Sequence, residues 1–446
     1  MINTKKFNLK YTQISALGFA AIIFMGAILL MLPISSRSGE VTPFINALFT
    51  SASATCVTGL VVYDTFTHFS LFGQIIILAL IQIGGLGFML IATLFSLMLK
   101  RRIGLKTRGL LKESVSTITI GGVVRLTKNI LKCTLVFEGI GAIILAFRFY
   151  GEMGFSRAVY NGIFHSISAF CNAGFDLMGR FEPSSSLTRF RGDIVVNLVV
   201  MALIVIGGIG FLVWQDLWVN KFKFSKYKLH TKIVLVATIG LIIFPTIIFY
   251  FMERKNLFLG MPAKDIVLSS LFQIITPRTA GFNTLNIASL TESSKLLTMI
   301  LMVIGGSPGS TAGGIKTTTF VIIIFSFISS LRHTQDLNIF NRRLENEIVK
   351  RAYNVGSTYL FGVVTSVLFI CAVQPLKLTD VFFEVFSALS TVGMTTGITS
   401  KLIGASKLVI IILMFCGRVG SLTIALAFTE KRETIPVRLP IEKISI

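Results

Sequence analysis

Four short stretches of this sequence end in a glycine that follows small and hydroxyl-bearing residues. They read Ser53-Ala-Thr-Cys-Val-Thr-Gly59, Ser168-Ala-Phe-Cys-Asn-Ala-Gly174, Ile275-Thr-Pro-Arg-Thr-Ala-Gly281 and Ser387-Ala-Leu-Ser-Thr-Val-Gly393. The final glycines are 115, 107 and 112 residues apart, so one unit occurs four times. Glycine permits backbone angles that are closed to other residues and lets chains approach closely. Four such stretches around an axis would present rings of carbonyl oxygens, which replace the hydration shell of a monovalent cation in potassium channels.

The predicted selectivity filter consists of the last three residues of each stretch, with a monovalent cation, as in potassium channels, at the four glycines. Its members are Val57, Thr58, Gly59, Asn172, Ala173, Gly174, Thr279, Ala280, Gly281, Thr391, Val392 and Gly393. The alternative is that glycines only allow close helix packing. We favour packing for the glycine pairs inside long apolar segments, which are Gly84, Gly85, Gly207 and Gly208. We favour the filter for the glycines that end short segments.

A second glycine motif follows each stretch at a regular distance. It reads Ile83-Gly-Gly-Leu-Gly-Phe88, Ile206-Gly-Gly-Ile-Gly-Phe211, Ile304-Gly-Gly-Ser-Pro-Gly309 and Cys416-Gly-Arg-Val-Gly420. In the third copy, five glycines and a proline fall between residues 305 and 314. A helix does not tolerate that composition, since glycine costs about 1 kcal/mol and proline about 3. A phosphate-binding P-loop is excluded because Ile315 separates Gly314 from Lys316.

We therefore expect a flexible loop inside the membrane below the filter, and Arg418 lies at the corresponding depth of the fourth copy. A charge at mid-membrane nearly always faces a water-filled path or a partner. We interpret the loop and the arginine as a gate, formed by Gly305, Gly306, Ser307, Pro308, Gly309, Ser310, Thr311, Ala312, Gly313, Gly314, Lys316 and Arg418. The alternative for Arg418 is a buried ion pair with Glu138 or Glu384. Arg278, beside the third filter stretch, is interpreted as a brace behind the filter.

The elements that position these residues are membrane helices. Of the 446 residues 53% are hydrophobic and 14% are charged, against roughly 25% charged in a soluble domain. Eight segments have the length of a membrane crossing: Ile14–Pro33, Leu71–Leu99, Ile130–Tyr150, Asp193–Val219, Thr231–Met252, Ser294–Leu331, Tyr353–Val373 and Leu402–Phe428. Of these, only Ser294–Leu331 is predicted to be interrupted. Four apolar pieces are too short to cross, which are Phe44–Thr58, Ala158–Phe170, Asp265–Ile275 and Val381–Ser390.

The net charge of +22 is explained by the orientation of the chain in the membrane and by attraction to anionic lipid. A nucleic-acid partner is therefore not expected. Five segments hold 26 of the 42 Lys and Arg residues: Met1–Lys10, Lys100–Lys132, Lys221–Lys232, Arg332–Arg351 and Thr429–Ile446. By the positive-inside rule all five are cytoplasmic. Both termini are then inside, and the four short pieces enter from outside.

The predicted fold is an all-α membrane protein with eight transmembrane helices in four parallel helix–pore loop–helix repeats around a central pore. The repeats cover residues 1–115, 116–230, 231–350 with the intramembrane loop 305–314, and 351–446. The five cysteines and four histidines are scattered, so no disulfide framework or metal cluster is expected. No acid pair or nucleophile–base set stands out, and we expect no enzyme activity.

The four stretches, continued by Leu60, Phe175 and Asn283, resemble the pore loops of the Trk/Ktr/HKT superfamily of cation transporters. Chain length and the Gly417-Arg418 pair resemble the membrane subunits of Ktr-type bacterial potassium uptake systems. The resemblance implies a multi-pass cell-membrane protein, a homodimer with one pore in each protomer, and a cytosolic ring of nucleotide-binding regulatory subunits (RCK type, KtrA-like). It also implies an intramembrane gate. Serine at the first filter glycine goes with sodium permeation in this superfamily, so Gly59 favours potassium.

Two alternatives stay open at this point. A sodium- or proton-coupled secondary carrier would also use broken helices and glycines at the membrane midplane. A sodium-permeable pore is a close variant of the favoured interpretation. No covalently bound cofactor is expected, potassium is the substrate, and sodium is a candidate activator.

Overall fold

The computed structural model describes residues 11–87, 90, 123–221, 223–334 and 336–420. The secondary-structure elements of the described chain are all helices apart from a two-stranded hairpin of β1 (Asn338–Ile339) and β2 (Arg342–Arg343). Much of the predicted cytoplasmic charge, including Met1–Lys10 and Thr429–Ile446, lies outside the described residues. The ends of two predicted segments, Leu71–Leu99 and Leu402–Phe428, also lie outside them.

Each repeat begins with a long apolar helix that packs against a short one. The long helices are α1 (Tyr11–Met31), α7 (Val123–Met153), α11 (Leu229–Glu253) and α15 (Asn346–Val373), and they are the four described helices long and apolar enough to cross a membrane. The short helices are α2 (Phe44–Thr55), α8 (Phe155–Phe170), α12 (Ala263–Ile275) and α16 (Leu378–Leu389). Each long helix packs against the short helix that follows it. The four short apolar pieces of the sequence are thus short helices.

In each of the four repeats, the last described helix ends or breaks near a glycine at the corresponding position. These helices are α4 (Leu71–Leu86), α9 (Ile194–Gly208) continued by α10 (Phe211–Asn220), α13 (Glu292–Val303) continued by α14 (Thr317–Leu331), and α17 (Gly404–Val419). The first, second and fourth end before a glycine with a φ of 87°, 97° or 98°, at Gly87, Gly210 and Gly420. A right-handed helix does not continue through such an angle.

The prediction of one unbroken crossing over Asp193–Val219 is therefore wrong, because α9 and α10 meet at an angle of 95°. The interruption of Ser294–Leu331 is confirmed, since residues 304–316 separate α13 from α14. Among the described residues, length and composition support four membrane-crossing helices, or five if the bent pair counts as one. These apolar helices make the chain a multi-pass membrane protein.

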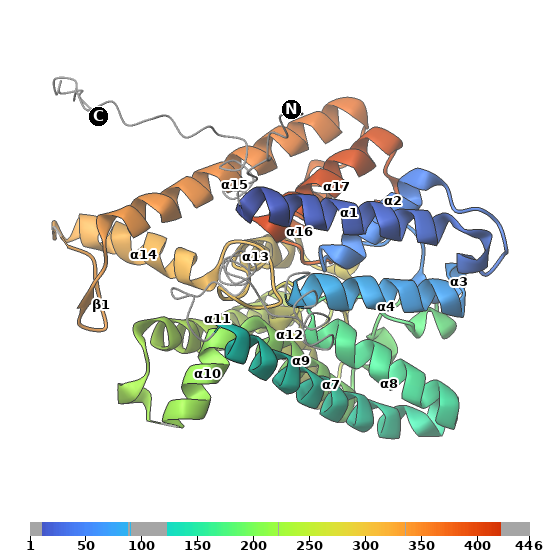
Figure 1. Cartoon of the computed structure of the whole chain (residues 1–446), viewed down its shortest axis with the longest axis horizontal. Helices are drawn as coiled ribbons and strands as arrows, with labels where there is room; N and C mark the ends of the chain where they lie inside the picture. Colours follow the sequence, from blue (N-terminus) through green and yellow to red (C-terminus); the bar gives the residue numbers. More distant parts are fainter. Residues whose placement is uncertain (1–10, 88–89, 91–122, 222, 335, 421–446) are drawn as a thin grey trace, which may run out of the picture.

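The repeats contact one another in cyclic order. The last helix of each repeat packs against the short helix of the next: α4 against α8, α9 against α12, and α13 against α16. The order closes because α17 packs against α2. In Figure 1, α1, α4, α8 and α17 run roughly along one direction, with α3 (Thr65–His68) at one end of the molecule and α10, α14 and β1 at the other.

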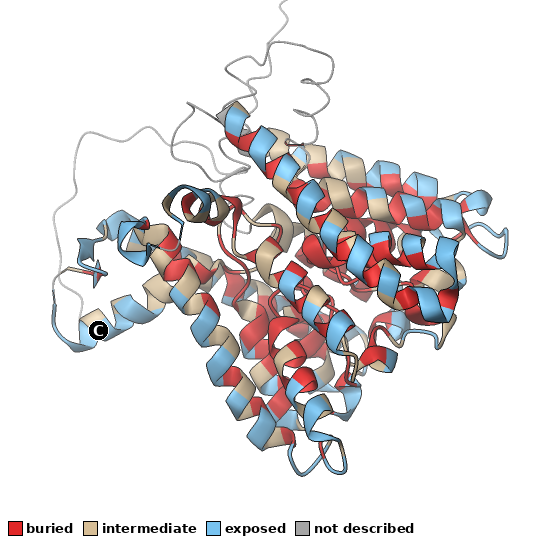
Figure 2. Ribbon diagram, turned by 90° about the horizontal axis from the view of Figure 1, so that it is seen from below, coloured by how far each residue is buried: buried red, intermediate tan, exposed pale blue. Residues whose placement is uncertain are grey.

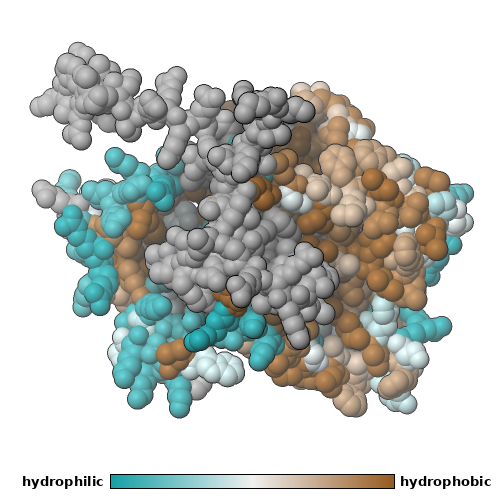
Figure 3. Space-filling view, viewed as in Figure 1, coloured by the Kyte–Doolittle hydropathy of each residue, from teal (hydrophilic) through white to brown (hydrophobic). Residues whose placement is uncertain are grey.

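The exposed faces of the long helices are apolar. Examples are Phe147 of α7, Phe244 of α11 and Phe361 of α15, with 79%, 68% and 71% of their surface exposed. In Figure 3 such residues form a broad band between hydrophilic residues at the two ends. Figure 2 shows buried residues gathered where the helices face one another and exposed ones on the outside. This distribution suits a hydrocarbon surrounding.

Candidate functional site

The four predicted filter stretches share one backbone conformation. In each, the terminal glycine has a positive φ, of 93° at Gly59, 70° at Gly174, 81° at Gly281 and 90° at Gly393. The residue two places earlier also has a positive φ, although it is not glycine: Val57, Asn172, Thr279 and Thr391, at 54° to 71°. Positive φ at a β-branched residue is a genuine outlier, which the surrounding structure has to impose. Asparagine tolerates this angle, so the strain lies at Val57, Thr279 and Thr391, while all four copies share the same backbone conformation.

The four glycines meet in a closed ring. A methyl group added to Gly59 would lie 2.5 Å from the carbonyl oxygen of Ala173, and one added to Gly174 would lie 2.5 Å from that of Ala280. Gly281 likewise faces the carbonyl oxygen of Val392, and Gly393 faces that of Thr58, each under 3.0 Å. The ring therefore passes through all four repeats and has no space for a Cβ atom.

A hydroxyl in the last turn of the short helix, or directly after it in the third repeat, holds the stretch that follows, a role that the sequence did not reveal. Ser53 and Ser387 accept a hydrogen bond from the N–H groups of Gly59 and Gly393, at 3.1 and 3.0 Å. Ser168 and Thr276 instead donate to the carbonyl oxygen after the glycine, at Phe175 (2.7 Å) and Phe282 (2.5 Å). The signal was present as the hydroxyl that opens three of the four stretches.

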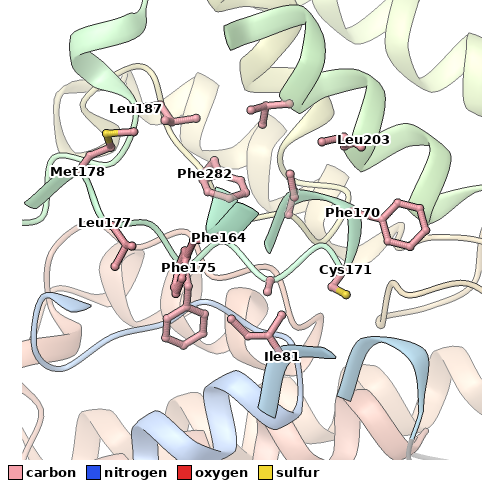
Figure 4. Close-up of a cluster of buried hydrophobic side chains, with 14 of the residues drawn as sticks. Ile81, Phe164, Phe170, Cys171, Phe175, Leu177, Met178, Leu187, Leu203 and Phe282 are labelled. Atoms are coloured by element: carbon pink, nitrogen blue, oxygen red, sulfur yellow. The ribbon is translucent and has the colours of Figure 1, made fainter. Parts of the chain in front are cut away.

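Buried side chains enclose the ring. Figure 4 shows the second stretch between Cys171 and Phe175, with Ile81 of α4 nearby, and all three side chains belong to one buried apolar cluster. Arg278 is buried in the third repeat, where its Nη2 donates to Thr238 of α11 at 3.2 Å. Its role as a brace stays a prediction. The tight surrounding fixes the backbone of the ring.

One side of the ring opens into a polar cavity of about 330 Å³, called the mouth cavity here. All four ring glycines line it, together with hydroxyl and amide groups and the carboxyl groups of Asp64 and Asp176. Its described lining residues include no Lys or Arg. Burial, together with the nearby charge of Asp64, raises the pKa of Asp176 to about 7. The two carboxyl groups in this lining favour a cation over an anion.

On the other side of the ring, three repeats pack alike. Gly84, Gly207 and Gly417 lie against the final carbonyl groups of α2, α8 and α16, which belong to Thr55, Phe170 and Leu389. A Cβ atom at any of these glycines would come within 3.0 Å of that carbonyl oxygen. This geometry agrees with the packing interpretation for the glycine pairs. The third repeat differs, because Gly305 lies against Gly313 of its own loop.

The loop 305–314 is anchored on the break between α9 and α10. The N–H of Ser307 donates to the carbonyl of Gly208 at 2.9 Å, and the N–H of Phe211 donates to that of Gly309 at 2.7 Å. Thr311 donates through its hydroxyl to the carbonyl of Phe170 at 3.1 Å. The loop thus supplies the hydrogen-bond partners that the broken helix lacks.

Arg418 joins this loop to the first repeat. Its guanidinium donates to the carbonyl oxygens of Thr311, Gly84 and Gly85, the last at 2.9 Å. Lys316 donates to the carbonyl of Ala312 at 2.7 Å. The structure therefore brings the predicted gate residues together, and the gating role itself stays a prediction.

The alternative ion pair is absent among the described residues. Glu138 accepts from Gln82 at 3.2 Å, and Glu384 accepts from Thr395 at 2.7 Å and from Thr399. Within the described chain no carboxylate pairs with Arg418. The arginine instead donates to main-chain oxygens. A sequence pattern cannot predict these partners, because every residue has a main-chain carbonyl group.

Comparisons with known proteins show which family this chain belongs to. A model of the TrkH family, described as cation transport protein, matches residues 10–434. The chain is 42% identical to Ktr system potassium uptake protein B of Bacillus subtilis over 96% of this chain and 95% of that one. It is 39% identical to potassium/sodium uptake protein NtpJ of Enterococcus hirae over 94% of this chain and 93% of that one.

The fold is similar to that of the crystal structure of the potassium transporter TrkH from Vibrio parahaemolyticus. The TM-score is 0.74 at 20% identity, covering 95% of this chain and 86% of the other. The superfamily resemblance deduced from the four glycine stretches is confirmed. The family model and these relatives show that the chain belongs to the TrkH family of cation transport proteins, which are transporters and not enzymes.

Proposed function

We propose that this chain is the ion-translocating subunit of a Ktr-type potassium uptake system and that potassium crosses through the ring. The observation that carries the proposal is the closed ring of contacts between four glycines and four carbonyl groups. Each repeat supplies one glycine and one carbonyl group, and each contact joins two neighbouring repeats. Such carbonyl groups take the place of water around a potassium ion. Support also comes from the relatives named as potassium uptake proteins.

The proposed path begins in the mouth cavity, passes the ring and meets the loop 305–314. Asp64 and Asp176 raise the local concentration of cations at the entrance. Below the ring, Arg418 and Lys316 place positive charge beside the loop. A positive charge raises the energy of a passing cation, so these residues form the closed state of the gate. Movement of the loop opens the path.

Assembly and orientation belong to the same proposal. We propose eight crossings of the cell membrane with both termini in the cytoplasm, and the four repeats around one pore. We further propose a homodimer that binds a cytosolic ring of nucleotide-binding, RCK-type subunits. The term "Ktr system" in the names of relatives supports a multi-subunit assembly. The basic segments Lys221–Lys232 and Arg332–Arg351 offer positive charge for docking on that side.

The competing function is a carrier coupled to sodium or protons, which the broken helices also fit. The name of one relative, potassium/sodium uptake protein, keeps sodium relevant. Reconstitution into liposomes, together with any cytosolic subunit that co-purifies, separates the two. We expect potassium flux and current driven by a potassium gradient alone, with no sodium present and equal pH on both sides. Strict dependence on a sodium or proton gradient would favour the carrier, and absence of potassium flux under every gradient would refute the proposal.

A further inference from the structure

A second cavity, of about 470 Å³, lies between the first and second repeats and is separate from the mouth cavity. Three arginines line it, and they come from three separate segments. Arg37 belongs to the connection after α1, Arg157 to the first turn of α8, and Arg180 to the short helix η2 (Met178–Arg180). We propose that this cavity, called the arginine cavity here, binds the phosphate group of an anionic membrane lipid.

No acidic residue neutralises these arginines in the described part of the chain. The lining of the arginine cavity includes no Asp or Glu, and none of the three arginines forms an ion pair with a described residue. Arg37 instead stacks on Phe66, 4.1 Å from the ring centroid. A cation–π contact leaves the N–H groups at the edge of the guanidinium free to donate. Three unneutralised cations around one hollow favour an anionic occupant.

A nearby group of arginines shows the ordinary arrangement. Arg148 pairs with Glu152 at 3.2 Å and also with Asp193, and Arg189 pairs with Glu152 at 3.4 Å. Both groups lie toward the face that carries the start of α8. Unlike this group, the three arginines of the arginine cavity have no acidic partner among the described residues.

The neutral side-chain amides of the arginine cavity already donate to carbonyl groups of the chain, although Oδ1 of Asn161 is buried without a partner in the described chain. The side-chain amide of Gln74 donates to the carbonyl of Phe69 at 2.9 Å and accepts from Tyr160 at 3.1 Å. The Asn161 amide donates to the carbonyl of Arg157 at 2.9 Å. The guanidinium groups remain as the donors available to a ligand. Guanidinium matches the geometry of phosphate oxygens, which accept two parallel hydrogen bonds.

Apolar neighbours select a lipid as the source of the phosphate. Leu71 lines the arginine cavity at the first residue of α4, and 60% of its surface is exposed. Phe72 and Phe155, at the starts of α4 and α8, are 41% and 72% exposed. These helix starts belong to the apolar surface that faces the membrane, so acyl chains reach the cavity edge while the phosphate lies among the arginines. A free phosphate ion has no use for the apolar edge.

The position of the arginine cavity gives the lipid a role in holding the repeats together. Arg37 and Leu71 belong to the first repeat, whereas Arg157 and Arg180 belong to the second. The same two repeats meet through α4 and α8, and their ring stretches touch at Gly59 and Ala173. A bound phosphate therefore links two neighbouring quarters of the ring. This inference does not depend on potassium being the transported ion.

The test measures lipid binding to the detergent-purified full chain by native mass spectrometry and by thermal shift. The probes are phosphatidylglycerol, zwitterionic phosphatidylcholine and inorganic phosphate. We expect phosphatidylglycerol to bind and to raise the melting temperature, with little effect from the other two. The double variant Arg157→Gln/Arg180→Gln should weaken phosphatidylglycerol binding by about tenfold, because it removes charge-assisted hydrogen bonds.

The matched control is Arg189→Gln, which removes an arginine that already has an acidic partner on the same face. It should leave phosphatidylglycerol binding unchanged. Arg37→Gln, in an exposed connection, replaces the double variant if that protein does not fold. Equal phosphatidylglycerol binding by the wild type and the cavity variants would overturn the site, and an equal shift with inorganic phosphate would overturn the lipid as its occupant. Since binding is the readout, failure here is distinguishable from a failure of potassium transport.

Discussion

At the ring, the four repeats contribute the same parts in the same conformation. Each supplies a glycine with positive φ, a second residue with positive φ two places earlier and a hydroxyl that holds the stretch. Directly beneath the ring, the first, second and fourth repeats place a glycine against the end of a short helix. The third repeat has the loop 305–314 at this position instead. The ring and the level beneath it lie on either side of the ends of the short helices. The ring has the same structure in all four repeats, whereas the level beneath it does not.

Under the proposed function, in which the ring binds the ion and the loop 305–314 is the gate, the difference follows from what each level has to do. A spherical ion is best surrounded by equivalent oxygens, so all four repeats are held to one geometry. A gate has to move without disturbing that geometry, and a single insertion allows this. The loop 305–314 is attached through hydrogen bonds to α8, α9, α10 and Arg418, and none of these bonds involves the hydroxyl groups that hold the ring stretches.

The largest effect is expected from breaking the symmetry of the ring with Gly59→Ser. The serine Cβ would collide with the carbonyl group of Ala173, and φ at this position is 93°. Displacement of one carbonyl group should lower potassium-over-sodium selectivity by about tenfold, equal to roughly 1.4 kcal/mol. Uptake of each ion into liposomes or cells measures the selectivity.

The matched control for this prediction is Gly39→Ser. Gly39 has a φ of 75°, but no atom lies within 4 Å of the place that a Cβ would take, so it shares the backbone strain without the ring contact. Its selectivity should equal that of the wild type. Unchanged selectivity in Gly59→Ser, or an equal loss in both variants, would show that the ring does not select the ion.

A smaller effect is expected when the asymmetric level is loosened by Arg418→Ala. The variant loses the hydrogen bonds to Thr311, Gly84 and Gly85 and removes a positive charge from the proposed path. Resting potassium flux should rise about fivefold, equal to roughly 1 kcal/mol of barrier. Selectivity should stay the same, because the ring is untouched. Flux without activating nucleotide is the measurement.

Arg418→Lys separates the two contributions of this residue. Lysine keeps the charge but lacks the planar fork that reaches several carbonyl groups at once. We expect a flux between those of the wild type and Arg418→Ala. Deletion of residues 309–313 should also raise the resting flux. If Arg418→Ala and the deletion both transport at the wild-type rate, the loop and the arginine are not a gate.

The parts that repeat were predictable from the sequence. The start of α2 at Phe44 and the end of α12 at Ile275 agree with the predicted pieces, because an apolar run of limited length before a glycine stretch defines a short helix. The register of the four glycines predicted where the repeats meet. Local composition carries this information, and periodicity shows it four times.

The parts that depend on a single distant contact were not predictable. The segment around Gly210 is apolar on both sides, so its composition resembles an unbroken helix. It bends because the N–H of Phe211 finds the carbonyl of Gly309 in another repeat. The carbonyl partners of Arg418 are equally invisible, since every residue presents the same main-chain group whatever its side chain.

The smallest effect is expected from titration at the mouth cavity, where the repeats also differ. The second repeat supplies Asp176, whose pKa is raised to about 7 by burial and by the charge of Asp64. The carboxyl group is charged above pH 7 and neutral below it. Potassium uptake at low potassium concentration should therefore fall by about twofold as the external pH drops from about 8 to about 6, because one charge no longer attracts cations to the entrance.

Asp176→Asn should remove this pH dependence and keep uptake at the low-pH level throughout. Glu40→Gln is the control, since Glu40 is exposed and does not line the mouth cavity. It should keep the wild-type pH profile. The effect should vanish at saturating potassium, because a charge at the entrance changes how often an ion arrives and does not alter the geometry of the ring. A pH dependence that persists in Asp176→Asn would place the titrating group elsewhere and would contradict the role given to Asp176 at the entrance.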